Sequence, residues 1–149
     1  HLRKKYNLVI GERTAEEIKI NIGSAVPRTE EIAMEVTGRN LITGLPKTLK
    51  IDSSEIYDAL KDPVGELIEA IQGVIERTPP QLASDIFNDG IVFSGGAAQL
   101  TGLSEAVYSV MKIPCGVADD PQTSVVMGCS RTLEDLSGMK YLFENGRRR

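Results

Sequence analysis

The chain has 149 residues, of which 41% are hydrophobic and 26% charged, and its formal net charge is −4. This length is enough for one domain or for the larger part of one, and the composition supports a packed core. The mild negative charge does not indicate a nucleic-acid-binding protein, and no apolar run approaches the roughly 20 residues that span a bilayer.

The first predicted elements are helical. Residues 2–8 have the pattern of a helix end, so we expect the chain to be a piece of a longer protein. A second helix is predicted between Thr14, which begins a capping box, and Gly23, which stands at a C-cap position. Glu16 and Lys19 lie one turn apart on this helix, away from its apolar stripe. They form either a surface ion pair or a carboxylate and an ammonium beside a ligand's hydroxyl groups.

Residues 25–63 predict a small β-rich unit. Apolar and polar residues alternate over residues 32–37, which is typical of a half-exposed strand. A turn is predicted at residues 38–40, with further strand material at 41–45 and 48–51. A period of two favours antiparallel strands with one solvated face, so we interpret this segment as a satellite subdomain.

Helices follow this unit. Asp52 or Ser53 is predicted to cap a helix through Leu60, and Pro63 is predicted as an early residue of a separate, longer helix. That longer helix has one wide apolar face and is expected to pack on a sheet. The face consists of Val64, Leu67, Ile68, Ile71, Val74 and Ile75. A short helix is predicted at residues 81–88.

Residues 91–111 predict a strand, a glycine turn and a helix, in that order. Residues 91–93 have the composition of a strand that is buried on both faces. At Gly95 and Gly96 a ligand can approach the backbone closely, and the following helix start offers free N–H groups to an anion. The same pattern fits a simple strand-to-helix connection, so it indicates only a candidate edge of a nucleotide site.

A second short strand is predicted at residues 115–118, followed by a turn at 119–121. Thr123 is predicted to cap a final helix through Leu136, whose small residues favour close approach to a sheet or to another helix. The two aspartates of the turn are adjacent and therefore converge poorly on a metal, so we interpret them as turn and cap residues. The complete order of elements predicts an α/β layer with an inserted lobe.

The remaining residue types exclude some chemistry. His1 is the only histidine, and the two cysteines, Cys115 and Cys129, form no CxxC pair, so neither a zinc site nor a histidine-based triad is expected. Two separated cysteines fit a reducing cytoplasm, where we expect both to be buried. The basic clusters at 3–5 and 147–149 are interpreted as solvated ends, or alternatively as contacts to acidic lipid or to a partner.

Four blocks of sequence occur in the order KYNLVIGERTAEEIKINIGSA, TGRNLITGLPKTLKI, TPPQLASDIFNDGIVFSGGAAQLTGL and DDPQTSVVMG. Together they resemble the C-terminal part of the MreB/Mbl family of bacterial actin homologues, over nearly the whole chain. The resemblance implies a partial lobe of the actin/Hsp70-like ATPase fold, with a mixed sheet flanked by helices. It implies a nucleotide-facing subdomain at residues 1–24 and 64–149 (actin-like IIA) and a small inserted α+β subdomain at residues 25–63 (actin-like IIB).

The resemblance also implies a cofactor. In this family ATP and Mg²⁺ lie between two lobes, and the part that resembles this chain holds the adenosine. The implied cofactor-binding residues are Glu16, Glu17, Ile18, Lys19, Gly95, Gly96, Ala97, Ala98 and Gln99. The family usually has a third glycine at the position of Ala97 and an apolar residue at that of Gln99, so we expect an altered nucleotide affinity. Neither catalytic nor metal-binding residues are implied in this chain, and Mg²⁺ is expected to be held mainly by the nucleotide and the other lobe.

The phosphate-gripping loops of the family precede the region that this chain resembles. Because phosphoryl transfer needs metal, phosphate and water positioned together, we do not expect this chain alone to hydrolyse ATP. The implied partners are further copies of the chain in a filament, with residues 25–63 as one contact surface, and a membrane protein of the RodZ type. The implied location is the cytoplasm at the inner face of the cell membrane, with only indirect membrane association.

The expected function is therefore that of an MreB-like, ATP-binding, filament-forming protein of rod morphogenesis. Two alternatives stay open. One is a nucleotide-independent scaffold or partner-binding module of the same fold, with Ala97 as a symptom of lost nucleotide use. The other is a kinase of the same superfold, which is disfavoured because no isolated acidic residue follows an apolar strand to serve as its catalytic carboxylate.

Overall fold

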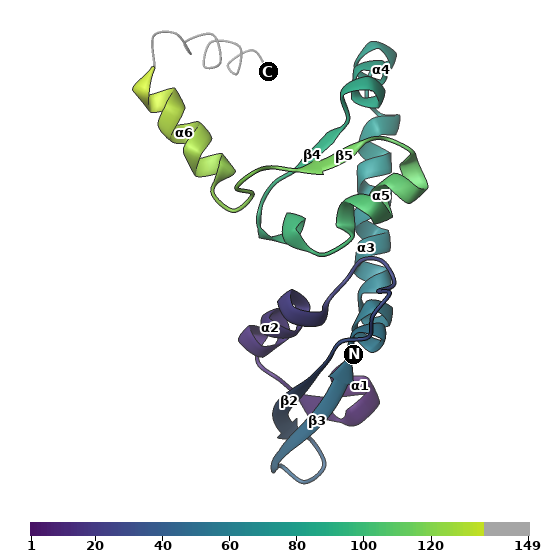
Figure 1. Ribbon diagram of the computed structural model, residues 1–149, viewed down its shortest axis with the longest axis vertical. Coiled ribbons are helices and arrows are strands. Elements are labelled where there is room, and N and C mark those ends of the chain that lie inside the picture. The colour runs from purple at the N-terminus through teal and green to yellow at the C-terminus, as the bar shows by residue number, and fades with distance from the viewer. Residues whose placement is uncertain (136–149) are drawn as a thin grey trace.

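The computed structural model describes residues 1–135, and the elements fall into two regions along a long axis (Figure 1). The first region contains α1 (Leu2–Tyr6), β1 (Leu8–Val9), α2 (Glu12–Ile22), β2 (Ala33–Asn40), β3 (Pro46–Asp52) and the start of α3 (Ser53–Glu76). The second contains the rest of α3, α4 (Pro80–Asp89), β4 (Ile91–Phe93), the 3₁₀ helix η1 (Gly96–Gln99), α5 (Leu103–Met111), β5 (Cys115–Val117) and α6 (Ser124–Glu134). This mixture of helices with antiparallel and parallel strands confirms the predicted α/β class.

The first region is built on an antiparallel sheet in the order β1-β2-β3. The predicted turn at residues 38–40 and the predicted strand at 41–45 are wrong, because β2 continues to Asn40 and residues 41–45 form the hairpin loop. The Asn40 side chain causes this placement: its Oδ1 accepts from the N–H of Ile42 at 2.8 Å, a local bond that competes with strand pairing. The apolar residues of this loop therefore lie at the hairpin tip instead of in the sheet.

One apolar core joins α1, α2, β2, β3 and the start of α3. It contains Leu2, Ile18, Ile22, Val36, Ile51 and Ile56. Residues 1–24 and 25–63 therefore contribute to the same core, and β1 also pairs with β2. The division into a subdomain of residues 1–24 and 64–149 and an inserted subdomain of residues 25–63 stays a prediction.

Helix α3 is the longest described element and connects the two regions (Figure 1). The predicted break before Pro63 is wrong, since the 24-residue helix continues through this proline. The predicted cap is confirmed for Asp52, whose Oδ1 accepts from the N–H of Glu55 at 2.8 Å. This bond and a second from the Ser54 hydroxyl lower the pKa of the Asp52 carboxyl. α3 contacts α2, β3 and α5, so it holds both regions together.

The second region contains a parallel pair of strands, in which Ile91 lies opposite Cys115 and Phe93 opposite Val117. Both strands were predicted, but the predicted burial of 91–93 on both faces is wrong, because Val92 is 71% exposed. In the described part of the chain this sheet has two strands, so both are edge strands, and Val92 in the middle of β4 stays exposed. Burial in this region is concentrated on α5, where the Val107 side chain is inaccessible to solvent.

Helix α6 projects to one side of the second region (Figure 1). None of its described residues is buried, so within residues 1–135 its small residues pack closely against no sheet or helix. Thr123 is its N-cap residue but forms no side-chain cap bond. Cys129 is exposed and Cys115 is half-buried, so the prediction that both cysteines are buried is also wrong. The predicted helix end at Leu136 and the basic cluster at 147–149 lie outside the described residues. Within residues 1–135, no helix has the length and hydropathy needed to cross a membrane.

Candidate functional site

Helix α2 presents one polar face to solvent because its apolar residues face the core. Ile18 and Ile22 are buried, which directs Glu16 and Lys19 outward. The predicted capping box at Thr14 is wrong, since the helix already begins at Glu12 without a side-chain cap. Its end was predicted correctly at Gly23, whose N–H donates to the carbonyl of Lys19 at 3.0 Å. A side chain at this glycine would collide with the same carbonyl oxygen.

The glycine turn follows β4 and forms a tight, anchored bend. Gly95 has φ +86°, a conformation that glycine adopts without strain, and its N–H donates to the carbonyl of Pro121 at 2.5 Å. The turn continues into the short 3₁₀ helix η1, and the helix predicted after the turn is α5, which begins at Leu103. The Gly96 Cα faces open space, since a Cβ placed there would meet nothing within 4 Å. A ligand can therefore approach this stretch of backbone closely.

A set of hydrogen bonds connects the end of α2 to the segment after η1; we call it the Ser24–Thr101 clasp. The Thr101 carbonyl accepts from the Ala25 N–H at 2.8 Å and, across 77 residues of sequence, from the Ser24 hydroxyl at 3.3 Å. The Arg28 guanidinium donates from Nη2 to the Gly23 carbonyl at 3.0 Å. Ser24 is fully buried, so its hydroxyl is shielded from competing water, whereas Thr101 is exposed. It fixes the distance between α2 and the glycine turn.

A cavity of about 420 Å³ lies between these two elements. It is lined by Glu16, Lys19, Ile20, Gly96, Ala97, Gln99, Leu100, Thr101 and Gln122. Small-molecule sites commonly have volumes of about 300–1,000 Å³ and combine apolar walls with a few polar groups. The cavity has both properties, because isoleucine and leucine side chains lie beside a carboxylate and an ammonium.

The structure brings together some, but not all, of the predicted site residues. Glu16, Lys19, Gly96, Ala97 and Gln99 line the cavity. The other four, Glu17, Ile18, Gly95 and Ala98, do not line it.

Glu17 faces solvent and its Oε1 accepts from Nε of Arg13 at 3.2 Å. Ile18 belongs to the core of the first region, and Ala98 is buried under η1. The N–H of Gly95 is already bonded to a carbonyl and is not available to a ligand. For these four positions the structure gives no cavity contact, so we leave them out of the proposed site.

Sequence reasoning missed Ile20, Leu100, Thr101 and Gln122. The Gln122 amide donates from Nε2 to Oε1 of Gln99 at 2.9 Å, which gives the polar side chain at position 99 a partner. A signal for this pair was present: the segments that follow two parallel strands leave the sheet at the same edge. Once β4 and β5 were predicted as strands, the residues after each could have been placed side by side.

The cavity is lined by one carboxylate and one ammonium, those of Glu16 and Lys19, which can bind hydroxyl groups. Glu16 and Lys19 form no ion pair with each other or with any other described residue. The Glu16 carboxylate can accept hydrogen bonds and the Lys19 ammonium can donate them. Glu16 is the only carboxylate in the lining of this cavity, whereas Mg²⁺ requires several oxygen ligands. Among the described residues, no cluster of three metal-ligating side chains occurs elsewhere either.

Comparison with known proteins identifies related sequences. The family model for the MreB/Mbl protein matches residues 1–141. The cell shape-determining protein Mbl of Bacillus cereus is 39% identical over 91% of this chain. The cell shape-determining protein MreB of Escherichia coli is 42% identical over 90% of it. The matches cover 41% and 39% of these two relatives, so the chain spans about 40% of their length.

Solved structures match the fold as well. MreB5 of Spiroplasma citri bound to ADP aligns with a TM-score of 0.86 at 33% identity, over 91% of this chain and 41% of that one. The AMPPNP-bound form of the same protein aligns over 97% of this chain and 43% of its own, at 34% identity. The MamK double helical filament, at 20% identity and a TM-score of 0.64, shares the fold alone. These matches confirm the predicted actin-like fold.

Proposed function

This chain belongs to the MreB/Mbl family of bacterial actin-like proteins, and we propose that it forms the adenosine side of an ATP-binding cleft in a filament-forming cell-shape protein. One observation carries the proposal. The polar face of α2 and the open backbone at Gly96 line a single cavity, although they lie far apart in the sequence. Nucleotide-bound MreB5 structures give independent support, because their fold over this region matches that of the chain.

The residues of the cavity have distinct roles in this proposal. Glu16 accepts hydrogen bonds from the ribose hydroxyls, and Lys19 donates to the nucleoside. Ile20 and Leu100 contact the purine, which loses apolar surface to water on binding. Gly96 lets the ligand lie against the backbone. Mg²⁺ stays with the phosphates in this scheme, because the cavity lacks a set of oxygen ligands for it.

Calorimetric titration of ATP tests these roles. The protein for the test is B. cereus Mbl in which this chain replaces the matching segment, so that a second lobe is present. Loss of two charge-assisted hydrogen bonds in the Glu16→Ala, Lys19→Ala double variant should weaken ATP binding by about tenfold or more. Glu17→Ala is the matched control, because Glu17 is on the same helix and does not line the cavity. An unchanged affinity in the double variant, or an equal loss in the control, would refute the assignment.

Ala97 offers a second, finer test of the same site. It lines the cavity beside Gly96, so its methyl group occupies space that the family's usual glycine leaves free. We expect Ala97→Gly to raise the ATP affinity of the same chimera, by a few-fold at most. A fall in affinity would show that the methyl group is a favourable contact and that our view of position 97 is wrong.

For filament formation we propose the tip of the β2–β3 hairpin as one contact surface. Leu41, Ile42 and Leu45 are all exposed there, with Ile42 at 77%. The hairpin lies at one extreme of the molecule (Figure 1), where an apolar tip can reach a neighbouring subunit. We place such filaments at the inner face of the cell membrane, with a RodZ-type protein as their tether, by family resemblance. An Ile42→Ser, Leu45→Ser variant of the chimera should pellet less than its parent at equal concentration.

A nucleotide-independent scaffold remains the second candidate, and the exposed hairpin tip is the observation that favours it. Such a protein would polymerise through apolar contacts without using the cavity. Sedimentation with and without ATP separates the two candidates. Our proposal predicts that ATP changes the fraction of protein that pellets. An equal pelleted fraction with and without ATP would support the nucleotide-independent scaffold.

A further inference from the structure

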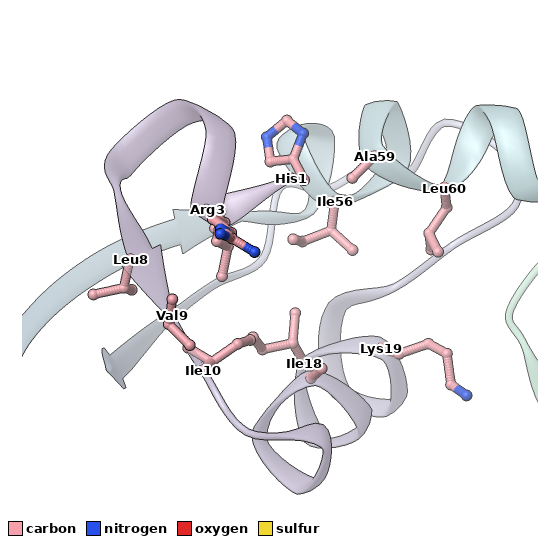
Figure 2. A pocket seen from close by; sticks show the side chains of 12 residues that line it. His1, Arg3, Leu8, Val9, Ile10, Ile18, Lys19, Ile56, Ala59 and Leu60 are labelled. Atoms are coloured by element: carbon pink, nitrogen blue, oxygen red, sulfur yellow. The ribbon is translucent and has the colours of Figure 1, made fainter. Parts of the chain in front are cut away.

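A second cavity, of about 370 Å³, lies between α1, β1, α2 and α3 (Figure 2). Its walls are mainly aliphatic. Ile56 and Leu60 of α3 point toward Ile10 and Ile18 across the space in Figure 2. None of the functions proposed above uses this cavity. Its volume falls in the range of small-molecule sites, which is about 300–1,000 Å³.

The charged groups at this cavity are all basic. His1, Arg3 and Lys19 belong to its lining, whereas no acidic residue does. The His1 ring already has a carboxylate partner, since its Nε2 lies 2.9 Å from Oε1 of Glu55. Lys19 stands at the edge of the cavity, and its ammonium is directed away from the aliphatic side chains (Figure 2). Arg3 lies on the α1 side and has no ion-pair partner in the described part of the chain.

We propose that this cavity is a binding site for a small apolar carboxylate, with the hydrocarbon chain between α2 and α3 and the carboxylate on Arg3. A guanidinium presents its donors in a fork that matches both oxygens of a carboxylate. The aliphatic walls exclude water from the hydrocarbon, so each buried methylene contributes about a fourfold gain in affinity. A ligand with the same hydrocarbon chain and an ammonium group would instead lie beside the basic side chains of Arg3 and His1. The cavity lining has no acidic residue to bind that ammonium.

Titration with three probes of the same length tests the ligand class. Hexanoate, hexanol and hexylammonium are each titrated into the 149-residue chain and followed by ligand-observed NMR. We expect hexanoate to bind most tightly, hexanol about five- to tenfold more weakly, and hexylammonium most weakly. Butanoate should bind up to about 16-fold more weakly than hexanoate, because it lacks two methylenes. Equal affinity for hexanoate and hexanol would overturn the assignment of a carboxylate site.

Two pairs of variants test the position of the ligand. Arg3→Gln should lower hexanoate affinity about five- to tenfold and leave hexanol unchanged, whereas Lys4→Gln, one residue along α1 and outside the lining, should change neither. Ala59→Leu fills the cavity and should abolish binding of both probes, whereas Ala70→Leu on the exposed side of α3 should not. The Arg3 and Ala70 side chains are exposed, so their variants stay folded. Retained binding in Ala59→Leu, or a loss in Ala70→Leu, would place the ligand elsewhere.

Lys19 lines both cavities and allows the two sites to be tested separately. Since its ammonium is directed away from the aliphatic walls, Lys19→Gln should change hexanoate affinity by less than about twofold. The same variant should weaken nucleotide binding in the Mbl chimera. The carboxylate site does not depend on the proposed function, and a loss of hexanoate binding equal to that of Arg3→Gln would contradict the placement of the carboxylate on Arg3.

Discussion

The two regions of the molecule bury their apolar side chains to different extents. In the first region the side chains of Ile22 and Ile51 are each only 1% exposed. In the second, Val92 is 71% and Val125 70% exposed, although both are apolar residues within a strand or a helix. The first region therefore completes a core from its own residues, whereas β4 and α6 of the second region leave apolar side chains exposed.

This difference bears directly on the candidate nucleotide cavity, because each region contributes one wall. The wall from α2 rests on the closed core, since Ile18 and Ile22 anchor that helix. The wall from η1 belongs to the more exposed region and is held in place by the Ser24–Thr101 clasp. We infer that the α2 wall is rigid and that the position of the other depends on the clasp.

The largest expected effect comes from a cavity in the closed core. Ile22→Ala should lower the free energy of unfolding by about 2–5 kcal/mol, because it removes buried aliphatic groups that the core cannot replace. Val92→Ala, in the exposed strand, should cost less than about 0.5 kcal/mol. Urea unfolding followed by circular dichroism measures both. A similar loss of unfolding free energy in the two variants would contradict the difference in burial between the regions.

The next effect concerns the connection between the regions. Gly102 has φ +75°, and a side chain there would collide with Val26 beside the clasp. Gly44 has φ +73° with open space around it, so Gly44→Ala shows the backbone cost alone, about 1–2 kcal/mol. Gly102→Ala should cost about 1–3 kcal/mol more, because overpacking adds to the backbone strain. Equal losses by urea unfolding would mean that the clasp adjusts easily and holds the η1 wall only loosely.

Cysteine reactivity resolves differences within the second region. Cys129 on α6 is exposed, whereas burial raises the pKa of the half-buried Cys115 thiol and reduces its thiolate fraction. We expect a thiol reagent at pH 8 to modify Cys129 at least about tenfold faster than Cys115. Cys115→Ser and Cys129→Ser assign the two phases. A faster reaction at Cys115 would show that β5 is more open than α6.

The smallest effect is a pH dependence at the start of α3. The N–H of Glu55 and the Ser54 hydroxyl hold the pKa of Asp52 below its ordinary value of 3.8. The ionised carboxylate therefore stabilises the fold above pH 3.8, and this contribution is lost as the pH falls through the lowered pKa. Asp52→Asn keeps a capping side chain without the charge. Its Tm should lie slightly below that of the parent at pH 7, and the difference should vanish in acid. A Tm difference for Asp52→Asn that persists below the lowered pKa would contradict this role.

Elements were predicted correctly from sequence where the local pattern of apolar residues matched their burial in the folded chain. The apolar stripe of α2 and the alternating apolar residues of β2 were both predicted, because these side chains are buried in the core of the first region. Pro63 was mistaken for a helix boundary because a proline removes one backbone donor, yet the helix tolerates that loss and continues. The apolar loop at residues 41–45 was mistaken for a strand, since its hydrophobicity comes from exposed tip positions and not from pairing.

The candidate site was predicted in part for similar reasons. Glu16, Lys19 and Gly96 were found because helix periodicity and a glycine turn are local features. Gln122 was missed because its place depends on the parallel pairing of β4 and β5, which brings two distant segments to one edge. The second cavity could not be predicted at all, since it arises from the way four elements pack around a shared space.

The most direct test of the nucleoside site is a titration of adenosine into the isotopically labelled chain, followed by amide chemical shifts. We predict that the amides of Lys19, Ile20, Gly96 and Ala97 shift together along one binding curve, because both walls contact the same ligand. Shifts on only one of these walls, or shifts confined to residues around Ala59 in the second cavity, would contradict the claim that α2 and the glycine turn form one nucleoside site.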